Sequence, residues 1–379
     1  MRVAHFGKYA FLRTGGVERH VVDLTTALVA KGVDVTVFTY DLSSHAEACT
    51  INGVHVEPVP SVINLSSQSI APALVARSRR LARERRFDVI HQHWPDPFAH
   101  FAASLVPGEP AHVVSWHTDI VRQRIIRPFY RALAPRVLKR PDAVVGATKS
   151  HLSSSQIACF APPERRHIVP YSIDARAFEA TNDVLRQAQA LKARYGGAPL
   201  IFALGRHVYY KGFDVLIRAM AGVPGILLLG GEGPLTVELK ALAAGLAGKV
   251  QFVGAIPEWE LPSFYYACDV FCFPSVAQTE AFGLVQAEAM VCGKPVVNTL
   301  LGNGVNEVAP DNLCALTVRP SDVEGLASAL CRILGEPELA CRLGAAGRQR
   351  VRMSYSVEAM VDCMVGLYEK VMGDRRRWG

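Results

Sequence analysis

Two glutamates flank a glycine in the stretch "TEAFGLVQAEAM", residues 279–290. In one continuous helix, the eight positions between Glu280 and Glu288 would separate them by roughly 12 Å and about 80° of rotation, which is too far to hold one small group. Gly283 instead predicts a helix that begins near residue 283 or 284, with Glu280 in the preceding loop and Glu288 in the second turn. We therefore expect the carboxylates to contact different parts of an extended ligand. Because two glutamates at this spacing also arise by chance in a chain of this length, other motifs have to support the hypothesis.

A basic loop, "LGRHVYYKG" at residues 204–212, leaves an apolar run and enters a helical one. Arg206 and Lys211 beside a helix N-terminus suit a diphosphate, because negative charge develops there on a leaving group. A solvated basic loop is the alternative interpretation. The next apolar run ends in "LLGGEGP", residues 228–234, where three glycines around Glu232 allow the backbone to approach a ligand closely.

The first half of the chain holds further candidates. Gly15 and Gly16 precede an amphipathic run that ends at Gly32, and they predict either a tight turn or a ligand contact, since the dinucleotide pattern G-x-G-x-x-G is absent. His117 follows "AHVVSW" and is either a hydrogen-bonded histidine at a strand end or a ligand contact. The histidines of "HQHW", His91 and His93, share one strand face but lack a third ligand, so we interpret them as structural or acceptor-facing.

Short apolar strands alternate with helical segments along the chain, which predicts parallel sheets covered on both faces. The first series runs from "RVAHF" to "DAVVGAT", a break follows near residues 168–178, and "LIFALG" begins a second series of the same kind. We predict an α/β fold with one doubly wound domain at 1–172 and another at 173–355. A C-terminal helix and basic tail, 356–379, should return to the first domain. In such sheets ligands bind at the carboxyl ends of the strands, where the candidate residues lie.

Composition supports a globular protein of two domains, because half of the 379 residues are hydrophobic and only 20% are charged. The net charge of +7 favours anionic partners, but no aromatic-and-basic strand or recognition helix supports nucleic-acid binding. Nine scattered cysteines without zinc spacing indicate reduced, buried thiols and no metal site. With no signal peptide and no apolar run of about 18 residues, we expect a cytoplasmic protein.

The ordered motifs Gly15-Gly16, "SWHTD", "GRHVYYKG", "GGEGP", "EAFGLVQAE" and "CGKPVV" resemble the retaining glycosyltransferases of family four. The resemblance covers nearly the whole chain. It implies the GT-B fold, in which two Rossmann-like domains with doubly wound parallel sheets face each other across a cleft. It also implies that a nucleotide-sugar donor binds mainly to the second domain.

The resemblance assigns roles to individual residues. It makes Arg206 and Lys211 a diphosphate clamp, and Glu280 the carboxylate that holds hydroxyls of the transferred sugar. Glu288 is expected to bind the ribose hydroxyls and His117 to lie near the donor sugar and the acceptor. The remaining predicted donor contacts are the backbone around Phe282, Gly283 and Leu284, the turn at Gly254 and Ala255 beside the base, Glu232 in "GGEGP", and Gly15 and Gly16 beside the diphosphate.

Two segments depart from the family pattern. At the domain junction "PYSID" places Tyr171 and Ser172 where a "PNGVD" segment is usual, and "LLGNGVNEV" leaves Asn303 and Glu307 without a role. No D-x-D pair occurs in the sequence, so we expect neither a metal nor a cofactor. The cations would neutralise the leaving diphosphate. The resemblance also implies front-face attack, in which the leaving phosphate takes the acceptor proton and the anomeric configuration is retained.

The acceptor is indicated only indirectly. Basic segments at 121–140 and in "ARSRRLARERR" predict either a solvated surface or peripheral contact with anionic lipid, which suits a glycan acceptor on a polyprenyl diphosphate. "SWHTDIVRQ" and "VPYSID" are similar to bacterial mannosyl- and rhamnosyltransferases of surface polysaccharides, including lipopolysaccharide, which favours a GDP-sugar over a UDP-sugar. A nucleotide-sugar epimerase of the same fold and a non-catalytic nucleotide-binding subunit are the alternatives.

Overall fold

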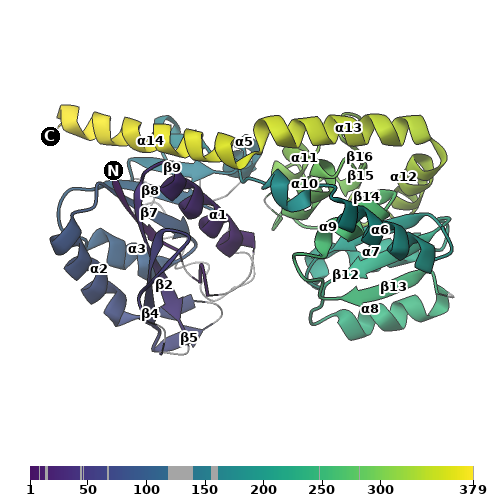
Figure 1. Cartoon of the computed structure of the whole chain (residues 1–379), viewed down its shortest axis with the longest axis horizontal. Coiled ribbons are helices and arrows are strands. Elements are labelled where there is room, and N and C mark those ends of the chain that lie inside the picture. Colours follow the sequence, from purple (N-terminus) through teal and green to yellow (C-terminus); the bar gives the residue numbers. More distant parts are fainter. Residues whose placement is uncertain are drawn as a thin grey trace. The chain divides into compact units, whose positions relative to one another are not determined.

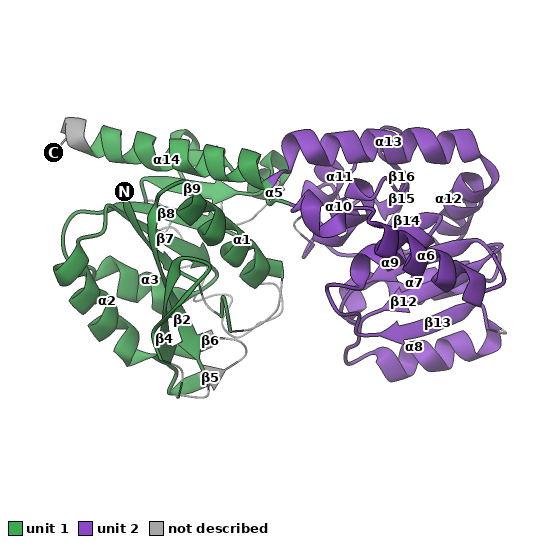
Figure 2. Ribbon diagram, viewed as in Figure 1, with its two compact units in different colours: residues 1–172, 357–379 green, residues 173–356 purple. Residues whose placement is uncertain are grey.

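The computed structural model divides the chain into two compact units (Figure 2). Unit 1 comprises Met1–Ser172 and Val357–Gly379, and unit 2 comprises Ile173–Ser356. The residues that the structure describes are 1–7, 9–12, 16–42, 45, 47–65, 68–117, 140–154, 161–246, 248–280 and 282–378.

Unit 1 is built on a sheet of eight strands in the order β10-β9-β8-β7-β1-β2-β4-β3. All neighbours pair in parallel except β3, which is antiparallel to β4. The strands are β1 (Arg2–Phe6), β2 (Asp34–Asp41), β3 (Cys49–Ile51), β4 (Val54–Pro60), β7 (Val89–Trp94), β8 (Ala111–Trp116), β9 (Ala143–Gly146) and β10 (Arg166–Ile168). A separate two-stranded ladder joins β5 (Ile63–Leu65) and β6 (Gln68–Ile70).

Helices cover both faces of this sheet (Figure 1). Alternate residues of β1 point to opposite faces, so Val3 packs with α1 (Gly16–Ala30) and α14 (Val357–Trp378), whereas Phe6 packs toward α2 (Pro72–Arg85) and α3 (Pro97–Ser104). Helix α5 (Lys149–Ser154) follows β9. Because Met360, Met364 and Tyr368 are part of the buried cluster, α14 completes the core of unit 1.

Unit 2 contains a parallel sheet of six strands in the order β13-β12-β11-β14-β15-β16. The strands are β11 (Leu200–Leu204), β12 (Ile226–Gly230), β13 (Val250–Gly254), β14 (Val270–Phe273), β15 (Val296–Thr299) and β16 (Ala315–Val318). Its helices are α6 (Asn182–Arg194), α7 (Phe213–Ala219), α8 (Thr236–Ala243), α9 (Leu261–Ala267), α10 (Leu284–Val291), α11 (Gly304–Val308), α12 (Val323–Gly335) and α13 (Pro337–Ser354). The predicted α/β class with two parallel-sheet units is confirmed.

The structure also contains elements that the sequence pattern did not predict. Strands β4 and β16 were not among the predicted apolar runs, and β10 ends at Ile168, where the segment interpreted as the domain break begins. The expectation of buried thiols is only partly correct: Cys268, Cys272, Cys292 and Cys314 are buried, but Cys49, Cys341 and Cys363 are exposed. Cys159 lies outside the described residues. Among the helices described, none has both the length and the apolar character needed to span a membrane.

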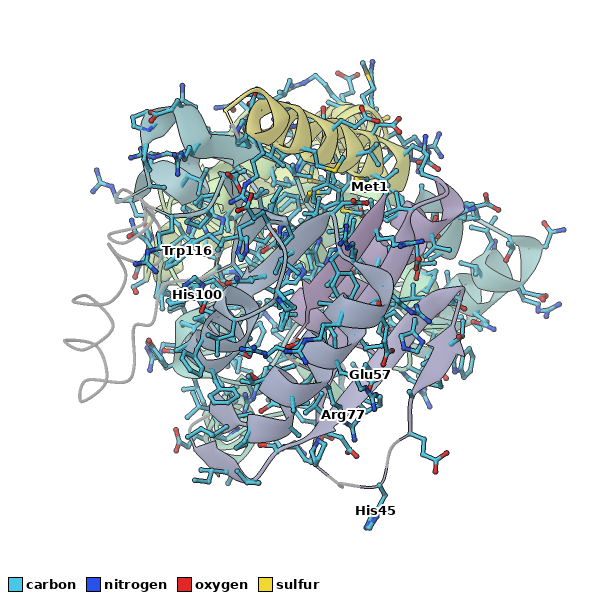
Figure 3. The ribbon with its side chains drawn as sticks, turned by 90° about the vertical axis from the view of Figure 1, so that its left-hand side faces the viewer. Met1, His45, Glu57, Arg77, His100 and Trp116 are labelled. Atoms are coloured by element: carbon cyan, nitrogen blue, oxygen red, sulfur yellow. The ribbon has the colours of Figure 1, made fainter. Side chains whose placement is uncertain are left out.

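One of the predicted basic segments is helix α2. Its Arg77, which is partly exposed, donates to the buried Glu57 of β4 across 3.3 Å and so links α2 to the sheet (Figure 3). Nearly all of the other basic segment, 121–140, lies outside the described residues.

Candidate active site

The sheet of unit 2 reverses its strand order between β11 and β14, because β12 and β13 extend it on one side and β15 and β16 on the other. At such a switch point, the loops after the two central strands diverge and leave a crevice at the carboxyl edge of the sheet. Lys211 belongs to the loop after β11, and Glu280 to the loop after β14. The fold therefore brings two predicted site residues to the position where parallel sheets bind ligands.

Glycines set the spacing between these loops. Gly231 has φ +100°, and a Cβ there would lie 2.1 Å from the carbonyl oxygen of Gly205. Gly212, at φ +64°, lies equally close to the loop after β14, since its Cβ would be 2.1 Å from the carbonyl oxygen of Pro274. A side chain at either position would push the loops apart and strain the backbone. The glycines of "GGEGP" and "YYKG" are thus required for the shape of the site.

Lys211 and Glu280 form a close ion pair, with 2.5 Å between Nζ and Oε1 and with side chains that are 12% and 15% exposed. The ammonium also lies 5.2 Å from the ring centroid of Phe273 and 5.9 Å from that of Tyr210. Burial raises the pKa of the Tyr210 hydroxyl, and the negative charge of Glu280 raises it further. Arg206 on the same loop is exposed, and its guanidinium makes no ion pair with any residue that the structure describes. A bound anion would therefore meet Arg206 without first breaking a salt bridge.

The helix that follows Glu280 begins where the sequence predicted. Gly283 adopts φ +76° as the N-cap of α10, which places Glu280 in the loop and Glu288 in the second turn. Within the described part of the chain, no side chain caps this N-terminus, so the first backbone N–H groups after Gly283 point toward the loop. Phe282 is 2% exposed and packs edge-on against Tyr355, with 5.3 Å between ring centroids, which anchors the start of α10.

Glu288 is more buried than expected for a residue predicted to bind ribose hydroxyls. Its side chain is 5% exposed, and Oε2 accepts a hydrogen bond of 2.7 Å from the hydroxyl of Tyr265 on α9. Burial raises the pKa of Tyr265 well above its usual value, with Glu288 adding to the effect, so the hydroxyl stays protonated and donates. Tyr265 was not identified from the sequence, because "SFYYACD" reads only as an apolar helix that enters a strand.

The predicted base-binding residues lie at the β13 side of the same edge. Gly231 donates its N–H to the carbonyl oxygen of Gly254 across 2.7 Å, and Gly254 has φ +72°. A Cβ at Gly254 would be 3.6 Å from a carboxylate oxygen of Glu232. Ala255 and Glu232 are exposed, so both face solvent at this edge of the sheet.

Asn303, which had no role in the sequence, holds the loop of Glu280. Its side-chain amide donates to the carbonyl oxygen of Glu280 at 2.5 Å, while its Oδ1 accepts from the N–H of Val305 at 3.1 Å as the N-cap of α11. An asparagine before a short helix is a recognisable cap signal, but its second bond depends on the tertiary fold. Asn303 therefore fixes the position of Glu280 through the backbone.

The structure describes only some of the candidate site residues of unit 1. Gly15 lies outside the described residues, as do Thr118 and Asp119 of "SWHTD", whereas Gly16 is the exposed first residue of α1. His117 is 3% exposed; its Nδ1 is hydrogen-bonded to the hydroxyl of Tyr171, and its Nε2 lies 2.9 Å from Nδ1 of His93. Both ring nitrogens are thus engaged within unit 1, as the hydrogen-bonded alternative predicted, and a substrate atom would have to replace one of these partners.

The expectation that His91 and His93 have no third ligand residue beside them is wrong. His5 on the neighbouring strand β1 is paired in register with His91, and its Nδ1 lies 3.0 Å from Nε2 of His93. The sequence could not show this, because the register of two parallel strands about 85 positions apart depends on the fold. Three buried imidazoles consequently lie together at the switch point of the unit 1 sheet, between β1 and β7.

The glycine contact at Gly231 can be tested directly. We expect Gly231→Ala to destabilise unit 2 by roughly 1–3 kcal/mol from the left-handed backbone alone, with a further cost from the contact with Gly205. Thermal unfolding followed by circular dichroism measures the loss. Gly245→Ala is the matched control, because nothing lies within 4 Å of its Cβ position. Equal melting temperatures for the two variants would contradict the proposed spacing of the loops.

Comparison with known proteins agrees with this geometry. The family model "Glycosyltransferase Family 4" matches residues 14–177, and the model "Glycosyl transferases group 1" matches residues 187–350. The two matches cover most of both units. The chain belongs to glycosyltransferase family four.

This family-four hexosyltransferase has relatives that match it over nearly their full length. It is 27% identical to D-rhamnosyltransferase WbpZ of Pseudomonas aeruginosa, over 94% of the chain and 92% of the relative. It is 24% identical to O-antigen chain mannosyltransferase C of Escherichia coli, over 98% of the chain and 99% of the relative. Sucrose-phosphate synthase from Thermosynechococcus elongatus has the same fold, with a TM-score of 0.82, 22% identity, and coverage of 98% of this chain and 99% of that one.

Proposed function

We propose that this enzyme transfers a mannose-type hexose, with retention and without a metal, from a nucleoside-diphosphate sugar to a glycan or a lipid-linked acceptor in polysaccharide synthesis. The observation that carries the proposal is the ion pair of Lys211 and Glu280 at the switch point of unit 2, with exposed Arg206 on the same loop. This arrangement provides separate groups for a diphosphate and for sugar hydroxyls.

The ion pair suggests how the donor organises the site. A diphosphate carries more negative charge than one carboxylate, so it competes with Glu280 for the ammonium of Lys211 while Arg206 contacts it directly. Glu280 then has lone pairs for the hydroxyls of the sugar, and carboxylates accept well from such hydroxyls. As the glycosidic bond to the diphosphate breaks, both cations stabilise the growing negative charge on the leaving phosphate.

We propose retention on the basis of the same groups. Asn303 fixes the loop of Glu280 through its backbone, and with the diphosphate on Lys211 the Glu280 carboxylate accepts from the sugar hydroxyls, so we infer that it does not act as a nucleophile at the anomeric carbon. We infer that the acceptor hydroxyl attacks from the side that the phosphate leaves and gives its proton to a phosphate oxygen. We infer that no step requires a divalent cation, because Arg206, Lys211 and the uncapped N–H groups of α10 are available to stabilise the developing charge.

The proposed classes of donor and acceptor are inferred from the names of the relatives. The names of the P. aeruginosa and E. coli relatives include rhamnosyl and mannosyl transfer, and the latter acts on an O-antigen chain. They support a GDP-activated hexose and a surface-glycan acceptor. A neighbour of the same fold, HepE of Anabaena, has been solved with UDP-glucose, at 20% identity and a TM-score of 0.78, so UDP-sugars belong in any test. We also propose that the arginines of α2 make peripheral contact with an anionic membrane on its cytoplasmic side.

A panel of GDP-, UDP- and ADP-sugars tests donor and reaction together. Thermal shift measures donor binding, and nucleotide release is followed with and without a polyprenyl-diphosphate-linked glycan. We expect GDP-mannose to give the largest stabilisation and nucleotide release that depends on the acceptor. A larger response to UDP-sugars would overturn the choice of donor. Release without acceptor would favour an epimerase, and binding without turnover would favour a non-catalytic subunit.

A further inference from the structure

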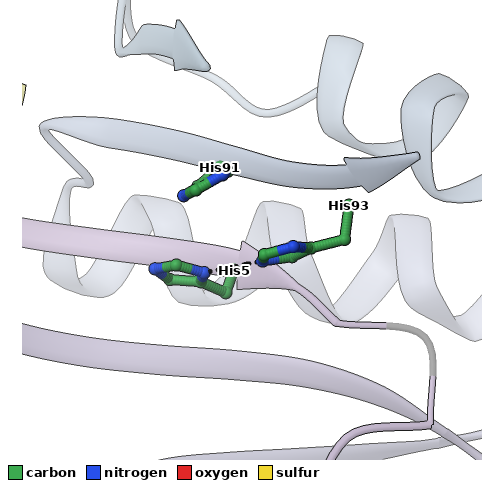
Figure 4. Close-up of side chains that lie close together, drawn as sticks. All are labelled: His5, His91 and His93. Carbon is green, nitrogen blue, oxygen red and sulfur yellow. Dashed lines mark hydrogen bonds between the residues drawn. The ribbon is translucent and has the colours of Figure 1, made fainter. Parts of the chain in front are cut away.

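Four buried histidines form a row across three neighbouring strands of unit 1. The histidine row consists of His5 on β1, His91 and His93 on β7, and His117 after β8, and each of these side chains is at most 3% exposed. Figure 4 shows three of the rings between the strands. The rings of His93 and His117 stack at 5.2 Å, and those of His91 and His93 at 4.6 Å. The catalytic assignment of Lys211 and Glu280 does not involve this row.

The row is connected by hydrogen bonds from one end to the other. At one end, the hydroxyl of Tyr171 is hydrogen-bonded to Nδ1 of His117. Nε2 of His117 lies 2.9 Å from Nδ1 of His93, and Nε2 of His93 lies 3.0 Å from Nδ1 of His5. The hydroxyl of Tyr368 on α14 joins His5 Nε2 at 3.3 Å to His91 Nδ1 at 2.5 Å, and His91 Nε2 reaches the hydroxyl of Ser115 at 2.7 Å.

Neutral rings in this arrangement cannot choose their tautomers independently. Burial lowers the pKa of His5 to about 3 and that of His91 and His93 well below the usual value, so each carries one N–H and one acceptor nitrogen. If His93 donates from Nε2 to His5, then His93 Nδ1 must accept from His117 Nε2, and His5 must carry its proton on Nε2 as well. The reverse direction places all of these protons on Nδ1. His5 and His93 therefore share one tautomer, and a neutral His117 shares it with them.

Tyr368 extends this rule to His91. Its hydroxyl is fully buried, and the two histidine nitrogens are its hydrogen-bond partners among the described residues. A hydroxyl that accepted from both rings would leave its own proton without a partner, which is costly in a buried site. The hydroxyl therefore accepts from one ring and donates to the other. As a result, His91 carries its proton on the same nitrogen, Nδ1 or Nε2, as His5 does.

A metal ion is the competing explanation, because one ring nitrogen from each of His5, His91 and His93 lies within 4.8 Å of the others. A metal needs lone pairs that all point to one centre. Here His5 Nδ1 and His93 Nε2 point at each other at hydrogen-bond distance, and each nitrogen of the three rings already has a partner. The contacts favour a hydrogen-bonded row over a coordination site.

We propose that the histidine row is a relay that couples the tautomer of His117 to the hydrogen bonds of Tyr368 on α14, with Tyr368 and His93 as positioning residues. Its effect on turnover rests on the proposed function, in which His117 lies near the transferred sugar. Because Tyr171 and His93 hold the two ring nitrogens of His117, the direction of the row decides whether Nδ1 of His117 offers a lone pair or a proton toward Tyr171.

The test uses the full-length enzyme labelled with ¹⁵N-histidine, whose imidazole shifts distinguish the two tautomers by NMR. Tyr368→Phe removes the joining hydroxyl and keeps the ring. Tyr40→Phe is the matched control, because it removes an equally buried hydroxyl of unit 1, bonded to Asp96 at 3.1 Å, outside the row. We expect one shared tautomer for His5, His91, His93 and His117 in the wild type. In Tyr368→Phe, His91 should no longer follow His5, and the control should keep the shared state.

Turnover gives the second readout. Losing a hydrogen-bond partner that orients a metal-ligating histidine costs about 10- to 100-fold. By analogy we expect Tyr368→Phe to lower kcat by about tenfold with little change in the donor KM, while Tyr40→Phe stays within about twofold. Mixed tautomers along the wild-type row, or stoichiometric zinc in the purified enzyme by elemental analysis, would overturn the relay. If the enzyme transfers no sugar at all, the proposed function fails, and the NMR result still decides on the relay.

Discussion

Lys211→Ala and Glu280→Ala should each lose most sugar transfer, with kcat lower by roughly two to three orders of magnitude, while the protein stays folded. Removing the ammonium leaves Arg206, among the residues that the structure describes on this loop, to stabilise the leaving diphosphate. Removing the carboxylate takes away the acceptor for the sugar hydroxyls and leaves Lys211 unpaired at 12% exposure. Steady-state kinetics with saturating donor measures kcat, and circular dichroism confirms folding.

The control for these variants is Lys192→Ala. Lys192 pairs with Asp269 at 2.6 Å in the same unit, but Asp269 accepts from the N–H of Leu200 and so lies at the amino ends of the strands. This variant should keep near-normal turnover although it breaks an ion pair of similar length. If both Lys211→Ala and Glu280→Ala turn over near-normally, or if Lys192→Ala is equally impaired, the ion pair at the switch point is not the catalytic centre.

The candidate site in unit 2 was largely predictable because its signals are local. Gly283 marks the start of α10 in the sequence as in the structure, which separates Glu280 from Glu288 and removes the apparent dyad. Arg206 and Lys211 follow an apolar run whose composition clearly predicts a buried strand. The roles of these residues toward a donor remain predictions.

The contacts that the sequence did not reveal are all made between distant segments. Asn303 reaches the loop of Glu280, Tyr265 holds Glu288, and His5 meets His93 across two strands. Each contact depends on strand order and register, which periodicity does not encode. The ion pair of Lys211 with Glu280 belongs to the same class: both residues were identified, but their direct pairing follows from the switch point between β11 and β14.

Unit 1 should unfold in mild acid before unit 2 does. Burial lowers the pKa of His5 and His20 to about 3 and that of His91 and His93 well below 6.5. At a pH between these lowered pKa values and 6.5, the histidines bind protons in the unfolded chain but not in the folded unit. The free energy of unfolding is therefore fully present above pH 6.5 and falls as the pH decreases below it. Eleven of the twelve histidines lie in residues 1–172, and only His207 belongs to unit 2.

The expected size of this effect is large. Each such histidine removes roughly 1 kcal/mol of unfolding free energy per pH unit below 6.5, so the four remove roughly 4 kcal/mol per unit. Typical domains have only about 5–15 kcal/mol in total. Unit 1 should thus unfold within roughly two pH units below 6.5. Tryptophan fluorescence reports on it selectively, because Trp94 and Trp116 are buried and stacked in unit 1 whereas Trp259 of unit 2 is 68% exposed.

Two variants separate the histidines from general acid effects. His20→Phe replaces a buried ring that packs against Tyr171 at 4.3 Å, and it should move the fluorescence midpoint to lower pH because the unfolded chain then binds one proton fewer. His45→Gln removes an exposed imidazole and should leave the midpoint unchanged. Wild-type fluorescence that stays constant down to pH 4 would mean that the folded unit accepts these protons. The buried histidines would then not be held neutral, and the tautomer rule that links them would lose its basis.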